Sequence, residues 1–305
     1  MDDGLDLTLL PAAVSPLVAA EVAGAPRRCR VLAAFPTCLY LDLGAHERVL
    51  AVLASDAVAL PIGLVVARPS AQLSWGVDPG AHVVVGEGRV RLPRAEVVAA
   101  RLQRPARVRP TTRGAGSPHG LPEAGLPDAG VLGDLARDLT SAALADRTVE
   151  PGVRGLIGVG RGLTPSGDDV LCGVLLTLAA VDTPRSRRAR SAVRTAVRTV
   201  LPWTTSLSAA LLVAAGEGYA VPDVVRLVTR CVAGSTDRTD GPERPQDRQI
   251  RPTSPSLDPS RGMTELVARV LAIGHTSGRD LLSGVAGALR AVDALDPAQE
   301  GAPRG

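Results

Sequence analysis

Glycine, hydroxyl and carboxylate side chains are concentrated in one short stretch, GVGRGLTPSGDD at residues 158–169. Glycine lets the backbone approach a ligand closely, and a serine or threonine at the start of a helix accepts a hydrogen bond from a first-turn N–H. The remaining N–H groups and the positive end of the helix dipole favour an anion such as phosphate or carboxylate. We therefore predict an anion-binding loop that contains Gly160, Arg161, Gly162, Thr164, Ser166 and Gly167.

Two adjacent aspartates, Asp168 and Asp169, end this stretch and precede an apolar segment. Negative charge is favoured in the first turn of a helix, so plain helix capping is one interpretation. A cap requires only one side chain, and the second carboxylate is then free to ligate Mg²⁺ or to orient a nucleophile. We predict that both aspartates are catalytic residues and that Mg²⁺ is the cofactor they would bind, with no organic cofactor implied.

The same stretch does not match two common nucleotide-binding motifs. The chain contains no lysine, which excludes the lysine-dependent phosphate loop and Schiff-base chemistry on a lysine. The spacing in GVGRGL also fails the Gly-x-Gly-x-x-Gly pattern of dinucleotide-binding folds, and no clear strand–helix–strand unit surrounds it. The anion site predicted here is therefore of another kind.

A second segment, SGRDLLSGV at residues 277–285, repeats the pattern of SGDDVLCGV at residues 166–174. The serine, glycine and second aspartate of the first segment recur in the second, and so does the later Gly-Val pair. The repeat predicts two similar loop-to-helix corners that together form a two-sided pocket. The residues expected to bind an anion at the second corner are Thr276, Ser277, Gly278, Arg279 and Asp280.

Three further polar residues are candidates for the same pocket. His275 lies directly before the second corner, and an imidazole can transfer protons near neutral pH. A packing or capping role is the alternative for this histidine. Thr205 and Ser206 precede another helical pattern, where they either cap the helix or contribute to the anion pocket.

The hydrophobic patterns predict an α+β protein with two parts. The first 107 residues form a small β-rich domain, barrel- or sandwich-like, because short runs rich in valine and leucine recur between residues 28 and 93. A hairpin is expected around Gly86-Glu87-Gly88, and residues 94–104 have helical periodicity. Residues 131–295 form a mainly helical domain, with helices expected at 130–147, 168–182, 185–201, 205–216, 222–233, 264–273 and 278–294.

Polar segments rich in proline or glycine separate these parts. Residues 108–130 are predicted to be a linker, since they lack any hydrophobic period. Residues 235–262 contain too little apolar surface to bury and are predicted to be a disordered insertion between two helices. Residues 296–305 are expected to form a flexible tail.

Charge and cysteine usage exclude several function classes. The net charge is only +3 and aromatic residues make up 2% of the chain, so a basic stripe with stacking residues for nucleic acid is not expected. No uncharged apolar run reaches the roughly 18 residues that a membrane span requires. The N-terminus lacks the basic region of a signal peptide, and the four cysteines are widely spaced. These features predict a cytoplasmic protein that binds neither nucleic acid nor membrane.

The stretch GVGRGLTPSGDDVLCGVL resembles the signature of a bacterial family associated with the AllH-type subunit of oxamate carbamoyltransferase. TTSLSAALLVAAGEG and IGHTSGRDLLSGV are also similar to the family pattern, so that the resemblance spans roughly residues 150–294. Arg161 stands where a small residue or proline is expected in this family. The β-rich first part matches the family only in outline.

The resemblance implies an enzyme that interconverts oxamate and carbamoyl phosphate with oxalurate and phosphate, in allantoin and purine breakdown. It implies a small anionic substrate and two dissimilar partner subunits. Two other interpretations of the residues stay open. One is a stand-alone, Mg²⁺-dependent enzyme acting on phosphate esters or acyl phosphates, and the other is a non-catalytic scaffold that uses the glycine-rich loop for docking.

Overall fold

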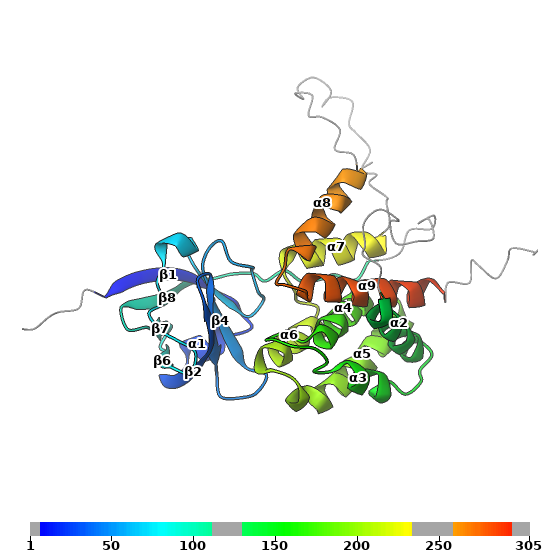
Figure 1. The fold of residues 1–305 in the computed structure, drawn as a ribbon, viewed down its shortest axis with the longest axis horizontal. Helices are drawn as coiled ribbons and strands as arrows, with labels where there is room; N and C mark the ends of the chain where they lie inside the picture. Colours follow the sequence, from blue (N-terminus) through cyan, green and yellow to red (C-terminus); the bar gives the residue numbers. More distant parts are fainter. Residues whose placement is uncertain (1–6, 112–129, 234–258, 295–305) are drawn as a thin grey trace, which may run out of the picture.

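The computed structural model describes residues 7–111, 130–233 and 259–294, and it has the expected α+β architecture (Figure 1). A β-barrel formed by the N-terminal residues lies beside a domain of packed helices. Most of the predicted linker, at residues 112–129, and most of the predicted insertion, at residues 234–258, lie outside the described residues. None of the described helices is long and apolar enough to cross a membrane.

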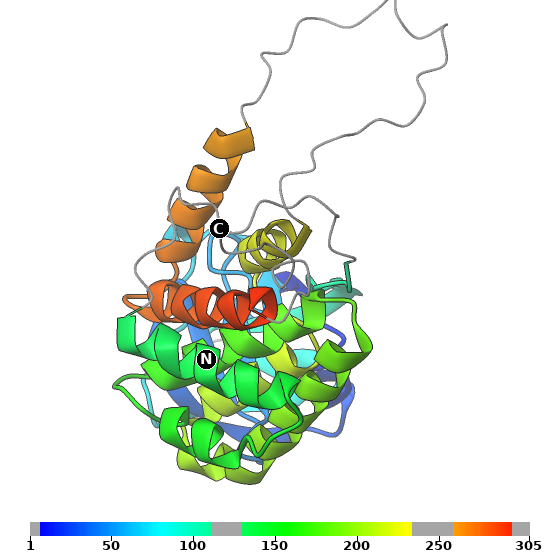
Figure 2. The ribbon, with the colours of Figure 1, turned by 90° about the vertical axis from the view of Figure 1, so that its right-hand side faces the viewer.

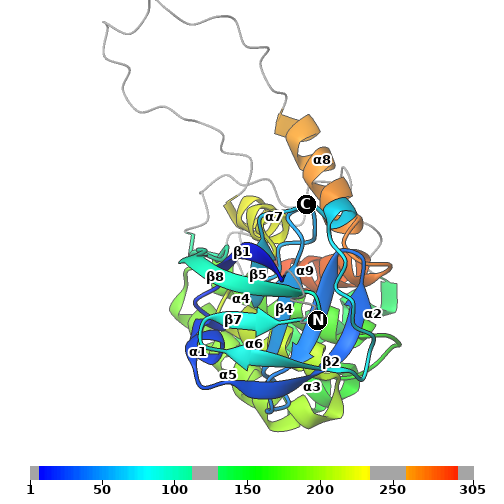
Figure 3. The same cartoon turned by 90° about the vertical axis from the view of Figure 1, so that its left-hand side faces the viewer.

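The barrel closes in the strand order β1-β5-β4-β3-β2-β6-β7-β8, with β8 parallel to β1. Strand β4 (Val49–Leu53) is buried along its whole length, and it contacts the helical domain as well as forming part of the barrel wall. Figure 3 shows the barrel from the side opposite the helical domain. A short helix, α1 (Ala19–Ala23), packs near β6 and β7. The remaining strands are β1 (Thr8–Val14), β2 (Arg27–Phe35), β3 (Cys38–Asp42), β5 (Gly63–Val66), β6 (His82–Gly86), β7 (Arg89–Arg91) and β8 (Ala95–Leu102).

The predicted hairpin is confirmed, but the helix predicted over residues 94–104 is wrong. Glu87 and Gly88 connect β6 to β7 with φ angles of 54° and 75°, the left-handed values that a tight two-residue hairpin turn requires. Residues 95–102 form β8, whose pairing with β7 and β1 closes the barrel. Ala95 and Val97 point into the core, so barrel closure overrides the helical propensity of this alanine-rich segment.

The helical domain is built around α4 (Ser166–Ala180), of which every residue after Ser166 is buried. Helices α2 (Gly130–Leu144) and α9 (Ser277–Asp293) lie side by side along it, and this layer faces the viewer in Figure 2. The other helices are α3 (Glu150–Leu156), α5 (Pro184–Val200), α6 (Ser206–Gly216), α7 (Pro222–Ala233) and α8 (Pro259–Leu271).

The helices match the predicted segments closely, with three differences. The sequence pattern gave no signal for α3, which contains two glycines and a proline. The amphipathic pattern of α2 predicts one buried face with Leu132, Leu135, Leu139 and Ala143. Leu139 and Ala143 are buried, but Leu135 is 42% exposed and Ala136 is buried in its place. Helix α8 begins at Pro259, so the last residues of the predicted insertion belong to a helix.

The barrel and the helical domain meet mainly through α6. Leu207 and Ala210 of α6 are buried in the core of the barrel rather than in that of the helical domain. In the β3–β4 loop, His46 lies beside the start of α6: its Nε2 is 3.0 Å from the carbonyl oxygen of Thr204, and its Nδ1 is 3.4 Å from the hydroxyl of Ser206. The loop that begins α6 is therefore held from both domains.

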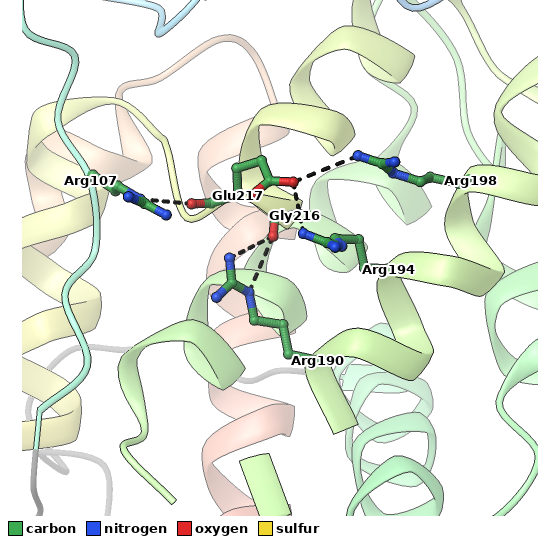
Figure 4. A network of polar contacts seen from close by, with 6 residues as sticks. All are labelled: Arg107, Arg190, Arg194, Arg198, Gly216 and Glu217. Atoms are coloured by element: carbon green, nitrogen blue, oxygen red, sulfur yellow. Dashed lines mark hydrogen bonds and ion pairs between the residues drawn. The ribbon is translucent and has the colours of Figure 1, made fainter. Parts of the chain in front are cut away.

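Arginines from two segments stabilise the C-terminal end of α6 (Figure 4). Arg190 of α5 donates two hydrogen bonds, of 2.6 and 3.1 Å, to the carbonyl oxygen of Gly216. Arg107, on the chain leaving the barrel, donates to the carbonyl oxygen of Glu217, and Arg194 forms a 2.7 Å ion pair with its carboxylate. Cations at the last carbonyls of a helix are favoured by its dipole.

Replacing Arg190 with alanine is expected to lower the free energy of unfolding by about 1–3 kcal/mol, because a half-buried, charge-assisted pair of hydrogen bonds is lost. Arg187, on the same helix, makes an exposed ion pair with Asp182, and its replacement should cost less than about 0.5 kcal/mol. Urea unfolding of the two variants compares them directly. Equal losses in the free energy of unfolding would contradict the stabilising role of the hydrogen bonds from Arg190 to Gly216.

Candidate functional site

Helices α4 and α9 cross at glycine-to-backbone contacts. A Cβ added to Gly173 would lie 2.3 Å from the carbonyl oxygen of Leu281, and one added to Gly284 would lie 2.2 Å from that of Val170. The two contacts are reciprocal, since each glycine faces the backbone of the other helix. The crossing therefore brings the N-terminal turns of the two helices near one another.

Each of these helices also begins in the same way. A Cβ on Gly167 would lie 1.9 Å from the carbonyl oxygen of Leu156, and one on Gly278 would lie 1.9 Å from that of Val270. In both cases the glycine of the Ser-Gly pair packs against the last turn of the preceding helix, α3 or α8. The sequence repeat is thus a structural repeat, and the prediction of two similar loop-to-helix corners is confirmed.

Hydrogen bonds join the two corners and the loop before α6. The hydroxyls of Thr164 and Ser277 are 2.8 Å apart, which connects the first corner to the second. The hydroxyl of Thr205 caps α6 by accepting a 3.1 Å hydrogen bond from the N–H of Ser208, and it donates to the carbonyl oxygen of Leu163. Residues 158–169, 203–206 and 274–280 consequently form one continuous cluster.

The two adjacent aspartates have different surroundings. Asp168 is 1% exposed and accepts hydrogen bonds from the N–H of Gly158, at 2.8 Å, and from the hydroxyl of Thr204. Burial raises the pKa of Asp168, and these hydrogen bonds oppose the rise. The position of Asp168 makes it the connection between the first corner and the loop before α6.

Asp169 is buried with fewer partners. Its side chain is 7% exposed, and its Oδ2 has no hydrogen-bond partner among the described residues. Burial raises the pKa of Asp169 to about 8; the nearby charges of Asp280 and Asp168 add to the rise, and the hydroxyls of Ser277 and Thr164 oppose it. Asp280, at the same place in the second corner, is also 7% exposed with an unpartnered Oδ2.

A cavity of about 230 Å³ lies between the barrel and the helices, with Asp169 in its wall. Thr164 and Ser277 line it beside Asp169, and Thr37, Tyr40 and Tyr219 supply further polar groups. Most of the wall is apolar, with side chains such as Leu53 and Leu60 from the barrel and Leu176, Leu211, Val224 and Ile273 from the helical domain.

Gly278 also lines the cavity and is buried, whereas the other predicted site residues do not line it. Several residues of the two corners are exposed. Ser166 is half-buried, and a Cβ on Gly160 would lie 2.6 Å from its backbone nitrogen, so this glycine permits a tight loop. Exposed predicted residues are Gly160, Arg161, Gly162, His275, Thr276 and Arg279.

Sequence reasoning missed the contribution of the barrel to the site. Tyr40, Leu53 and Leu60 line the cavity although they lie more than a hundred residues before the first corner. Nothing in their local sequence distinguishes them from other barrel residues, because their role depends on how the two domains pack. His46 was also given no role, yet it contacts the loop before α6.

Asp168 and Asp169 were the residues expected to bind a metal ion. No group of three or more histidine, cysteine, aspartate or glutamate side chains in the described part of the chain is arranged to hold one. Both oxygens of Asp168 already accept hydrogen bonds. A magnesium ion here would take most of its ligands from water or from a substrate phosphate, as Mg²⁺ commonly does.

Residues 156–244 match the family model described as oxamate carbamoyltransferase subunit AllH. The matched segment begins at the end of α3 and contains the first corner, α4, α5, α6 and α7. The barrel and the second corner lie outside it. No curated protein and no solved structure gives a significant match to the chain.

Proposed function

We propose, from the match of residues 156–244 to the AllH family model, that the chain is a carbamoyltransferase subunit whose site is the loop cluster around Asp169. The proposed reaction interconverts oxamate and carbamoyl phosphate with oxalurate and phosphate. The observation that supports the site is the buried, underpartnered carboxylate of Asp169 beside two hydroxyls, at the edge of a cavity.

In the proposed reaction, the amide nitrogen of oxamate attacks the carbamoyl carbon. A C–N bond forms, the C–O bond to phosphate breaks, and phosphate leaves with the bonding electrons while the nitrogen loses a proton. Asp169 would accept that proton, since a carboxyl group whose pKa is about 8 exchanges protons near neutral pH. The hydroxyls of Thr164 and Ser277 would stabilise the oxyanion of the tetrahedral intermediate.

The exposed arginines provide the phosphate contacts of this proposal. Arg161 and Arg279 lie on the two corners that the hydrogen bond between Thr164 and Ser277 joins. Guanidinium groups bind phosphate and carboxylate through paired hydrogen bonds. Their exposure also suits a site that is completed by other subunits, and the family description names a subunit rather than a whole enzyme.

The test is carbamoyl transfer by the chain assembled with the partner subunits that the proposal requires. Release of carbamoyl phosphate from oxalurate and phosphate is measured for the parent complex and for Asp169→Ala. A loss of at least about 100-fold is expected, as for the removal of a proton-transferring group. Asp138→Ala is the matched control, because Asp138 is exposed on α2 and pairs only with Arg137 among the described residues. Full activity of Asp169→Ala in an intact complex would contradict the proposal.

The same assay separates the proposal from the two other interpretations. Turnover of acyl phosphates by the isolated chain with Mg²⁺ would favour a stand-alone enzyme. Unchanged turnover by a complex that carries both Asp169→Ala and Thr164→Ala would favour a scaffold role for this chain. Dialysis of the isolated chain against Mg²⁺, with and without phosphate, tests the predicted metal at Asp168 and Asp169.

A further inference from the structure

The cavity between the two domains combines one polar cluster with an extended apolar wall. Thr164, Asp169 and Ser277 form the polar cluster, and leucine side chains from both domains supply much of the rest. A volume of about 230 Å³ exceeds the roughly 150 Å³ that accommodates benzene. The cavity is therefore large enough for a small ring or alkyl chain that carries one polar group.

Among the described residues that line the cavity, Asp169 is the only one with a carboxylate, guanidinium or imidazole group. Asp168 and Asp280 lie close enough to Asp169 to act on it through their charges. A buried carboxylate without a partner is costly, and an anionic ligand would add repulsion to that cost. A cationic group lowers the cost of burying the carboxylate, because it pairs with that carboxylate. It also offsets the neighbouring negative charges, so that no repulsion is added.

The free protein avoids much of this cost by holding a proton on Asp169, and an ammonium group that pairs with the carboxylate would favour the ionised form. Oδ2 of Asp169 and Oδ2 of Asp280 have no hydrogen-bond partner in the described chain, although both side chains are more than nine-tenths buried. The other two acceptors nearby, the hydroxyls of Thr164 and Ser277, are bonded to each other. An ammonium group has three N–H donors, which matches one carboxylate and two hydroxyl oxygens.

We infer that this cavity binds a small primary amine, with the ammonium group at Asp169, Thr164 and Ser277 and an apolar body against Leu53, Leu60 and Leu211. The body reaches the cavity through its exposed edge, where Val58 is 40% exposed and Gly274 is also exposed. This inference goes beyond the proposed function, because such an amine would bind to the isolated chain whether or not the chain takes part in carbamoyl transfer.

Calorimetric titration of the isolated chain at pH 7 tests the inference with three ligands of similar shape: 2-phenylethylamine, 2-phenylethanol and 3-phenylpropionate. The amine is expected to bind at least tenfold more tightly than the alcohol, and the carboxylate more weakly than both. The amine should also raise the melting temperature in a concentration-dependent way, because it binds only the folded state. Equal affinity for amine and alcohol would contradict the inference, because the cavity would then select only for apolar bodies. Tighter binding of the carboxylate would also contradict it, because the cavity would then prefer an anionic ligand.

Two variants separate the polar cluster from the apolar wall. Asp169→Asn should reduce the preference for amine over alcohol to near one while alcohol binding persists. Leu211→Trp should fill the cavity and weaken both ligands at least tenfold, and the exposed Asp138→Asn should change neither affinity. Should Asp169→Asn not fold, Thr164→Ala replaces it, with an expected several-fold loss for the amine alone. Retention of the full amine preference in the folded polar variant, or of amine binding in Leu211→Trp, would overturn the inference.

Discussion

Asp169→Asn is expected to make the protein more stable at pH 8, by about 3–5 kcal/mol in the free energy of unfolding, even though it removes a proposed catalytic group. Burial, together with the charges of Asp280 and Asp168, raises the pKa of Asp169 to about 8 in the folded protein, against about 3.9 for an unfolded chain. Asparagine has a similar shape and carries no charge to bury.

The sign of the pH dependence follows from the same pKa. Between pH 4 and pH 8 the folded protein holds a proton on Asp169 that the unfolded chain has lost, so stability falls as the pH rises through this window. Below pH 4 both states are protonated, and the parent protein and Asp169→Asn should differ little. Above pH 8 both states are ionised, and the full difference between the two proteins is present.

Urea unfolding of both proteins at pH 4, 6 and 8 measures this difference. The gap in the free energy of unfolding should widen by more than 1 kcal/mol for each pH unit in the middle of the window. The exposed Asp138→Asn serves as the control and should stay within about 0.5 kcal/mol of the parent at every pH. A gap that does not change with pH would contradict the assignment of an uncompensated buried charge to Asp169.

Gly167→Ala is expected to destabilise the protein by about 3–5 kcal/mol, among the larger effects that one methyl group can produce. The added Cβ would lie 1.9 Å from the carbonyl oxygen of Leu156, and the neighbouring atoms are backbone that cannot rotate away. Relief requires α3 and α4 to separate, which would also displace the first corner. Gly278→Ala should have a similar effect at the second corner, since its Cβ would lie 1.9 Å from the carbonyl oxygen of Val270.

Gly155 provides the matched control for this prediction. It lies in α3, one residue before Leu156, and a Cβ there would meet no atom within 4 Å. Alanine is favoured over glycine inside a helix, so Gly155→Ala should stabilise the protein by up to about 1 kcal/mol. Thermal unfolding of the three variants tests the destabilisation expected for Gly167→Ala and Gly278→Ala and the stabilisation expected for Gly155→Ala. A mild effect of Gly167→Ala would show that the first corner is not packed as tightly as the contact with Leu156 requires.

The sequence predicted the helical domain better than the barrel, and the reason is the range of the interactions. Periodic patterns and capping residues mark α5 and α6 locally, and Thr183 and Thr205 do cap them. Strands β1 and β8 depend on each other across nearly ninety residues, and Pro11 in β1 weakens its local signal. The pattern of residues 94–104 therefore predicted a helix where pairing produces a strand.

The candidate site could be predicted in part, because its central elements repeat. The two Ser-Gly corners share a sequence pattern, and this pattern reflects a real contact between Thr164 and Ser277. The different surroundings of Asp168 and Asp169 could not be predicted, since adjacent positions on a helix point in different directions and meet different loops. The role of the barrel in lining the cavity depends on domain packing, which no local pattern encodes.

The wall of the cavity is formed by two parts of the chain, the segment that the family model matches and the barrel. Thr164, Asp169 and Leu211 lie within residues 156–244, the segment that the family model matches, whereas Leu53 and Leu60 belong to the barrel outside it. Natural variation or engineering in the barrel would thus alter the shape offered to a ligand without touching the shared loop. Under the proposed function, proteins that share the matched segment can differ in the ligand they accept, because part of the cavity wall comes from another domain.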